Sequence, residues 1–206
     1  INYKDSIDQG FVRGDAVYRD TTANRRIDAD EFQYREKSNY FRAIKRDKRP
    51  LFRQLIEEDT LYMSADTLLS AQDSSGLNYI NAVRRVLIYK SDLQGMCDSL
   101  YYTEKDSSFV MTGQPVVWSD TTQFSADTIR ILLRNDEVRE IIAISNSFII
   151  SKENEQLFNQ IKGKLIHAYL DSNRLKQMFV KGNAESLYFL KDDEDAYVGP
   201  SKTLCS

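Results

Sequence analysis

One repeated pattern limits what this chain can fold into. A small residue and an aspartate precede a run of alternating apolar and polar residues, as in "MSADTLLSA" and "FSADTIRILL". The aspartates are Asp30, Asp66, Asp98 and Asp127, which by subtraction lie 36, 32 and 29 residues apart. A second run follows each aspartate and contains a small residue, namely Ala43, Ala82, Gly113 and Ala143. Alternation with a period of two is typical of half-buried strands, so the sequence predicts an all-β stack of antiparallel two-strand repeats.

The segment 153–179 allows a second interpretation. Its apolar spacing also fits a pair of helices. However, Gly163 and the turn signal at Asp171 lie where the repeat requires them. We therefore expect strands in this segment as well.

Composition excludes several classes of protein. The net charge of -3 does not indicate a nucleic-acid partner, and no apolar run is long enough for a membrane helix. Cys97 and Cys205 lie far apart without the spacing of a metal site, so no metal or other cofactor is expected. The sequence leaves open whether these two cysteines pair.

The repeats resemble those of a known family. Strands of the form SAD-x-L/I, answered by TGxxVV or AxxxxFII, are similar to the OstA-like family of periplasmic lipopolysaccharide-transport proteins. The resemblance extends from about Gly14 to Leu190 and rests on the order and spacing of short motifs. The chain departs from the family pattern by an insertion around Phe41 to Ile56 and by an ending inside another repeat.

The resemblance implies a fold and a function. It implies that residues 1–206 form a single V-shaped, open β-jellyroll whose apolar groove shields the acyl chains of lipopolysaccharide. The expected protein is not an enzyme but a periplasmic module of the bridge to the outer membrane. Its expected partners are the lipid A portion of lipopolysaccharide and other jellyroll modules, which pair through edge strands.

Alternation also predicts which side chains face the interior. Each of these residues is interpreted either as lining of a lipid groove or as ordinary core. The groove candidates are Met63, Leu68, Leu100, Tyr102, Val116, Trp118, Phe124, Ile129, Ile131, Phe148 and Ile150.

A basic stretch interrupts the repeats. Its cations are Arg42, Lys45, Arg46, Lys48 and Arg49. They are interpreted either as a lip that contacts lipid phosphates or as a solvated loop. The repeated aspartates are expected to be structural, and His167, the only histidine, lies in no recognisable nucleophile motif.

Two other functions stay open at the level of sequence. One is a structural scaffold or adhesin stalk with a dry interior, and the other is a carbohydrate-active β-solenoid. The chain begins at Ile1, and its ending around Cys205 resembles the start of another repeat around Cys97. We therefore expect a fragment of a longer repeat protein whose exposed edge can form head-to-tail oligomers.

Overall fold

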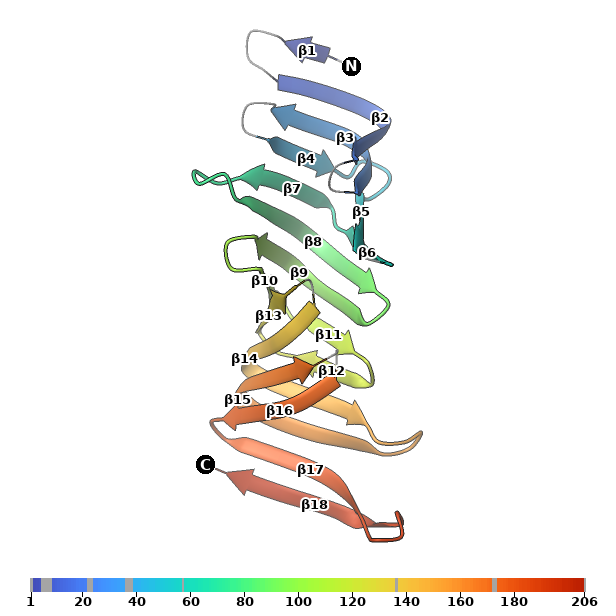
Figure 1. The fold of residues 1–206 in the computed structure, drawn as a ribbon, viewed down its shortest axis with the longest axis vertical. Coiled ribbons are helices and arrows are strands. Elements are labelled where there is room, and N and C mark those ends of the chain that lie inside the picture. The colour runs from blue at the N-terminus through green and yellow to red at the C-terminus, as the bar shows by residue number, and fades with distance from the viewer. Residues whose placement is uncertain are drawn as a thin grey trace. The chain divides into compact units, whose positions relative to one another are not determined.

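The computed structural model describes residues 2–4, 9–21, 24–35, 39–56, 58–135, 137–171 and 174–205, with the backbone alone for 2–4. It consists of two compact units, Ile1–Thr112 (unit 1) and Gly113–Ser206 (unit 2), which are described separately below. The described residues form strands and connections and contain no helix (Figure 1). The predicted all-β class is confirmed.

The described residues of unit 1 form ten strands. They are β1 (Asn2–Lys4), β2 (Gln9–Asp20), β3 (Arg25–Arg35), β4 (Tyr40–Ile44), β5 (Leu51–Ile56), β6 (Asp59–Ser64), β7 (Thr67–Gln72), β8 (Asn78–Lys90), β9 (Leu93–Thr103) and β10 (Ser108–Thr112).

The described part of unit 2 forms eight further strands. They are β11 (Val116–Ser119), β12 (Thr122–Ser125), β13 (Thr128–Arg134), β14 (Glu137–Lys152), β15 (Phe158–Asp171), β16 (Arg174–Lys181), β17 (Ala184–Lys191) and β18 (Tyr197–Cys205). Strands β15 and β16 occupy most of the segment for which a helix pair was the alternative, so the strand prediction there is confirmed.

Within unit 1, the long strands contribute to two antiparallel ladders. Ladder A joins the first part of β2 and the second part of β3 to β4, β7, residues 78–83 of β8, residues 99–103 of β9, and β10. Ladder B joins the remaining parts of β2, β3, β8 and β9 to β5 and β6. In Figure 1, β4 and β7 of ladder A are seen face-on, whereas β5 and β6 of ladder B are seen nearly edge-on.

Unit 2 has the same organisation. Ladder C joins β11 and β12 to residues 147–152 of β14, 158–163 of β15 and 185–187 of β17. Ladder D joins β13 to residues 137–144 of β14, 165–171 of β15, and β16. Strand β18 pairs with β17 along its length.

A strand passes from one ladder to the next through a corner of one of two kinds. In β8 the corner is a bulge of two residues with positive φ, Arg84 at 66° and Arg85 at 52°. The corner between β6 and β7 contains Asp66, whose backbone N–H donates to the Arg84 carbonyl at 3.0 Å. In unit 2, Asp127 N–H donates in the same way to the carbonyl of Ser145, which has positive φ, at 2.9 Å. The repeated aspartates therefore mark corners.

Each unit has its own buried interior. In unit 1 this interior includes Met63, Leu68, Val86, Leu100 and Met111, which are almost fully buried. The interior of unit 2 consists largely of isoleucines together with Phe124 and Val117; these isoleucines are Ile129, Ile131, Ile141, Ile149 and Ile166. Burial of these apolar side chains is the main stabilising contribution in both units.

The predicted insertion is part of the regular fold. Residues 41–56 contain β4 and β5, one in each ladder, with the connection 45–50 between them at the corner. Lys45 N–H donates to the carbonyl of Asp66 at 2.8 Å, which joins this connection to the neighbouring corner. The segment 41–56 therefore supplies one strand to each ladder, whether or not it is an insertion relative to the family pattern.

Candidate functional site

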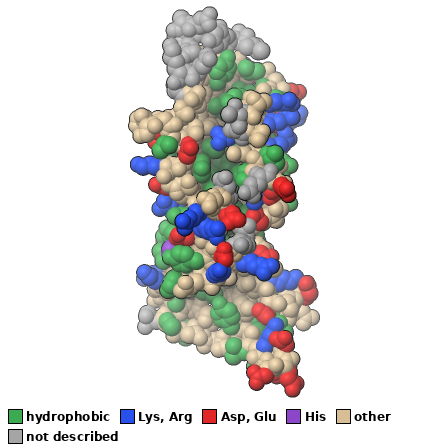
Figure 2. Space-filling view, in the orientation of Figure 1, with side chains coloured by type: hydrophobic (Ala, Val, Ile, Leu, Met, Phe, Trp, Pro, Cys, Tyr) green, Lys and Arg blue, Asp and Glu red, His purple; other side chains and the backbone are tan. Residues whose placement is uncertain are grey.

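Unit 1 contains a cleft of about 1020 Å³ between its two ladders. Side chains that line its apolar floor come from both ladders and are Ile27, Phe32, Phe41, Phe52, Met63 and Leu68. Figure 2 shows hydrophobic side chains between charged ones in the part of the view that β2 to β9 occupy in Figure 1. The volume lies at the upper end of the range of roughly 300–1,000 Å³ that is typical of ligand pockets.

The register of the strands places these side chains in rows. In ladder B, Tyr18 lies opposite Ile27, Ile27 opposite Phe52, and Phe52 opposite Met63. Directly paired residues of antiparallel strands point to the same side of a sheet. The four side chains therefore form one row on the inner face, and all of them line the cleft.

An equivalent row crosses ladder A. Tyr34 lies opposite Phe41, and Phe41 lies opposite Ser70. The rings of Tyr18 and Phe41 come from different ladders, and their centroids are 4.9 Å apart. Aromatic side chains of the two ladders thus meet across the cleft, and Phe32 lies against Phe41 with centroids 4.8 Å apart.

A glycine gives Tyr34 its place in the cleft. Gly10 is paired directly with Tyr34, and a Cβ atom at Gly10 would lie 1.9 Å from Cζ of that ring. The Tyr34 ring therefore covers the glycine backbone, which holds the ring in a fixed position beside the cleft.

Exposure changes along unit 1. Tyr18 is 43% exposed although it lies on the inner face, whereas Met63 in the same row is 1% exposed. The inner residues Leu100 of β9 and Met111 of β10 are also buried. The interior is therefore open to solvent near β2 and packed near β9 and β10.

Polar side chains surround the opening of the cleft. The charged residues among its lining are Asp20, Arg25 and Arg35. The guanidinium of Arg35 lies over the Tyr40 ring at 5.1 Å, and Asn39 donates to Gln72 at 2.7 Å. An apolar floor with a polar margin is an arrangement suited to an amphiphilic ligand.

Seven groove candidates from the sequence lie on the inner faces or next to them. Met63 and Leu68 line the cleft. Leu100 belongs to the packed part of unit 1, and Tyr102 is half-buried with its ring 4.8 Å from Phe109. The candidates Phe124, Ile129 and Ile131 are core residues of unit 2, each at most 1% exposed.

Four other candidates point to the opposite face, so their predicted orientation is wrong. Val116, Trp118, Phe148 and Ile150 are half-buried, and the inner positions are taken by their neighbours in the chain. Trp118 is paired with Gln123, to which its Nε1 donates at 2.9 Å. The buried inner row is Val117, Phe124, Ile149 and Ile161.

The two kinds of corner explain this error. A one-residue Asp corner shifts the alternation, so that Ala126 before Asp127 and Ile129 after it are both buried. A two-residue bulge preserves the alternation, so Ala143 and Ile149 share the inner face. Residues after a bulge therefore face inward when they lie an even number of positions after the small residue of the repeat. Phe148 lies an odd number of positions after it and points to the other face.

The predicted basic loop is not a single loop. Arg42 lies inside β4, paired with Gln33 and Leu69, while Lys45 begins the connection to β5. The other three cations have partners within unit 1: Arg46 Nε donates to Glu31 at 2.7 Å, Lys48 Nζ to Asp15 at 3.3 Å, and Arg49 Nη1 to the Arg85 carbonyl at 2.8 Å. Contact with lipid phosphates stays a prediction.

Hydrogen bonds at the corners give two of the repeated aspartates a structural role. Asp30 accepts from the backbone N–H groups of Lys48 and Asp47 at 2.7 and 2.8 Å, and these bonds, that of Lys48 foremost, lower its pKa. Asp66 accepts from Arg85 at 2.7 Å, and this bond is the largest cause of its lowered pKa. Among the described residues, no cluster of histidine, cysteine, aspartate and glutamate could hold a metal ion.

His167 is a strand residue with two side-chain neighbours. Its Nε2 lies 2.6 Å from Glu140 Oε2, and its ring is stacked on Tyr169 with centroids 4.3 Å apart. Neither a serine nor a cysteine takes part in these contacts, so they do not form a nucleophilic triad.

Both cysteines are free thiols. Cys97 is buried in β9, and burial raises the pKa of its thiol to about 12, whereas Cys205 is exposed in β18. The pairing that the sequence left open is not formed.

Comparisons with known proteins were made for the whole chain. Neither the known protein-family models nor the curated proteins gave a match. Within the described ranges, no helix is long and apolar enough to cross a membrane.

Proposed function

We propose that this chain is a lipid-binding module that shields acyl chains in the cleft of unit 1. The single observation that carries the proposal is the apolar cleft of about 1020 Å³, open beside Tyr18 and lined by both ladders. Each methylene transferred from water to such a surface contributes about 0.8 kcal/mol. A lipid chain therefore gains several kcal/mol without any specific polar contact.

The resemblance of the repeats suggests which lipid this is. OstA-like proteins carry lipopolysaccharide through the periplasm, and we propose the same ligand, compartment and absence of enzymatic activity here. In this proposal, ladders A and B are the two sheets of a V-shaped, open jellyroll. The aromatic pair of Tyr18 and Phe41 lies between them.

The proposal includes pairing through an edge strand. Within the described part of the chain, β18 pairs with β17 alone, and its Val198 and Leu204 are 64% and 65% exposed. Unpaired backbone groups and apolar side chains on an edge favour addition of another strand. The added strand would come from another jellyroll module or from a second copy in a head-to-tail oligomer.

Unit 2 favours a second candidate function. Its inner residues Ile129, Ile131, Ile141 and Ile166 are almost completely buried, as in an ordinary sheet core. A module with a dry interior of this kind is a structural scaffold that presents its strands or loops to partners. This candidate requires that lipid does not enter unit 1.

Photo-crosslinking tests the proposal with a matched pair of tyrosines. Tyr18 and Tyr62 both lie in ladder B and are 43% and 37% exposed, but only Tyr18 lines the cleft. Tyr62 points to the other face, where its ring is 6.2 Å from that of Tyr89. A photoreactive residue at either position is irradiated with purified lipopolysaccharide.

The two functions give different results in this experiment. A lipid carrier is labelled from position 18 and much less from position 62. Equal labelling from the two positions, or none from either, contradicts the proposal and favours the scaffold.

A further inference from the structure

We propose that the cleft of unit 1 binds amphiphiles with an anionic head group, and that Arg25 holds this head group. The inference rests on the proposed lipid-binding function and adds the chemical class of the ligand's polar end. The shared chemistry is a carboxylate or phosphate joined to an acyl or alkyl chain.

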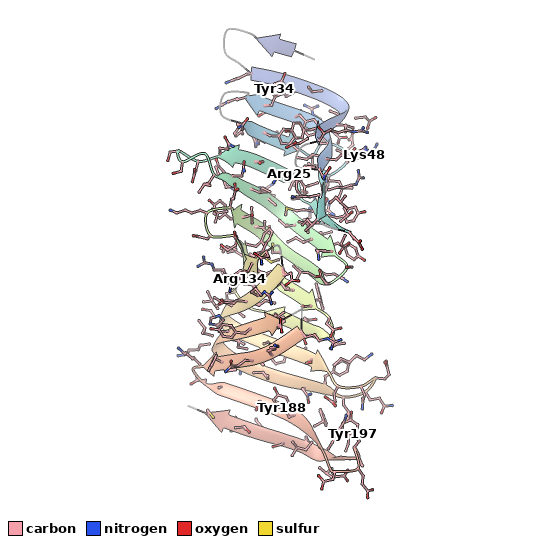
Figure 3. All side chains as sticks on the ribbon, viewed as in Figure 1. Arg25, Tyr34, Lys48, Arg134, Tyr188 and Tyr197 are labelled. Carbon is pink, nitrogen blue, oxygen red and sulfur yellow. The ribbon has the colours of Figure 1, made fainter. Side chains whose placement is uncertain are left out.

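Arg25 lies where such a head group would leave the apolar floor. It is the first residue of β3, paired with Asp20 across the hairpin and with Gln54 of β5. Ile27, two residues further along the same face, belongs to the inner row of ladder B. Arg25 lines the cleft and is labelled together with Tyr34 in Figure 3. The row thus changes from apolar to cationic at the end of the strand.

The guanidinium of Arg25 has an unused donor. Its Nε is buried and has no hydrogen-bond partner within the described part of the protein. A buried donor without an acceptor is unfavourable, and such groups are uncommon in folded proteins. An acceptor supplied by a ligand in the cleft would remove this cost.

Other arginines of unit 1 are satisfied by the protein itself. Arg26 and Arg53 both donate to Asp28, at 2.5 and 2.6 Å respectively. Arg46 donates to Glu31, and Arg85 donates to Asp66. Each of these four arginines therefore has a carboxylate partner within unit 1.

Nearby carboxylates leave room for an external anion. Glu104 attracts Arg25 electrostatically, but its Oε2 already accepts from the backbone and side chain of Asn78 at 2.9 and 2.7 Å. Asp20 carries one negative charge at the cleft, against the two positive charges of Arg25 and Arg35. The charged lining is therefore net positive, which complements an anion.

The chemistry of arginine determines which head groups fit. A guanidinium presents donors in a planar fork that matches two oxygens of a carboxylate or phosphate. An alcohol offers one neutral oxygen and gains much less from the same fork. Ligands with equal chains but different head groups are therefore the direct probe.

The test measures binding of dodecanoate, dodecyl phosphate and dodecanol to the full chain by displacement of an apolar fluorescent dye. We expect the two anions to bind at least about tenfold more tightly than dodecanol. Arg25→Gln should remove this preference and leave dodecanol binding unchanged. The matched control Arg134→Gln, at an exposed arginine of unit 2, should retain the preference.

The possible results separate the role of Arg25 from the proposed lipid-binding function. Equal affinity of the three ligands in the wild type, or a preference that persists in Arg25→Gln, overturns the role of Arg25 while lipid binding stands. If none of the ligands displaces the dye, the proposed function itself fails. Tighter binding of dodecanoate than of dodecyl phosphate identifies a carboxylate head group, and the reverse order identifies a phosphate.

A stability measurement separates binding from folding. Because Nε of Arg25 has no partner among the described residues, Arg25→Gln should unfold at the same urea concentration as the ligand-free wild type, or higher. Saturating dodecanoate should raise the midpoint of the wild type more than that of the variant. A large loss of ligand-free stability in the variant would show a structural role and would overturn the proposal.

Discussion

Replacement of Phe124 by alanine distinguishes a core residue from a groove residue. The sequence leaves Phe124 as either a groove residue or an ordinary core residue, and the structure places it in the inner row of ladder C between Val117 and Ile149, 1% exposed. Removal of a fully buried Phe side chain costs about 3–5 kcal/mol, because it loses apolar burial and leaves a cavity. This is a large fraction of the roughly 5–15 kcal/mol that stabilises a typical domain.

A built-in fluorophore reports on this change. Trp118 is the only tryptophan of the chain, and its Nε1 donates to Gln123, the residue before Phe124. Urea unfolding of Phe124→Ala, followed by tryptophan fluorescence, should show the full loss in unit 2. The control Val198→Ala removes a side chain that is 64% exposed and should change the free energy by less than about 0.5 kcal/mol.

A small loss of stability in Phe124→Ala would contradict the assignment of this residue to the core. A groove residue that contacts lipid would be replaced with little loss of stability and a large loss of lipid binding. A destabilisation below about 1 kcal/mol for Phe124→Ala, with an unchanged urea dependence, would therefore refute its assignment to the core.

Three further predictions follow from individual side chains. A hydrogen bond from its arginine partner lowers the pKa of Asp66. The charged carboxylate therefore stabilises the folded protein fully above its unfolded pKa of about 3.9, and this stabilisation is lost as the pH falls through the lower pKa of the folded state. The urea midpoint should thus fall below about pH 4, and a fall of equal steepness in Asp66→Asn would contradict this contribution. Cys97, buried and with its pKa raised to about 12, should resist a thiol reagent at pH 8 while Cys205 reacts; two fast-reacting thiols in the native protein would disprove this. Gly10→Ala should lose about 1–3 kcal/mol, because the added Cβ would lie 1.9 Å from the Tyr34 ring. Tyr34→Ala should remove most of that loss in a double-mutant cycle, and strictly additive effects would show that the two residues do not contact.

The sequence predicts the strands well. The folded strand keeps the alternation of buried and half-buried residues around Ile129 and Ile131, with Asp127 directly before the strand. Both features depend only on local sequence. It is harder to predict which residues of β8 and β14 face inward, because this depends on two-residue bulges with positive φ. These bulges occur at Arg84-Arg85 and Ser145-Asn146, where no glycine or proline marks them. Consequently, the inner faces after the bulges could not be read from the pattern alone.

The cleft is harder still to predict. Phe32 and Phe41 alternate like any other core residues, and the separation of ladders A and B is a tertiary property that strand periodicity does not encode. The available signal is the density of aromatic residues between positions 32 and 41, where Tyr34 and Tyr40 accompany the two phenylalanines. Such a cluster favours an interior that is not filled by aliphatic side chains.

Side-chain shape gives a physical reason why similar repeats form an open interior in one unit and a closed interior in the other. Branched side chains such as Ile131 and Ile141 of unit 2 are directly paired and fill the space above a sheet compactly. In unit 1, the rings of Tyr18 and Phe41 meet from opposite ladders with centroids 4.9 Å apart, so flat side chains span the interior without filling the space beside them. That space is the cleft, and Arg25 at its opening brings a buried Nε donor that no described residue accepts. An interior left unfilled, beside a buried guanidinium Nε that has no acceptor among the described residues, is unfavourable for a scaffold and suited to a protein that binds an anionic lipid.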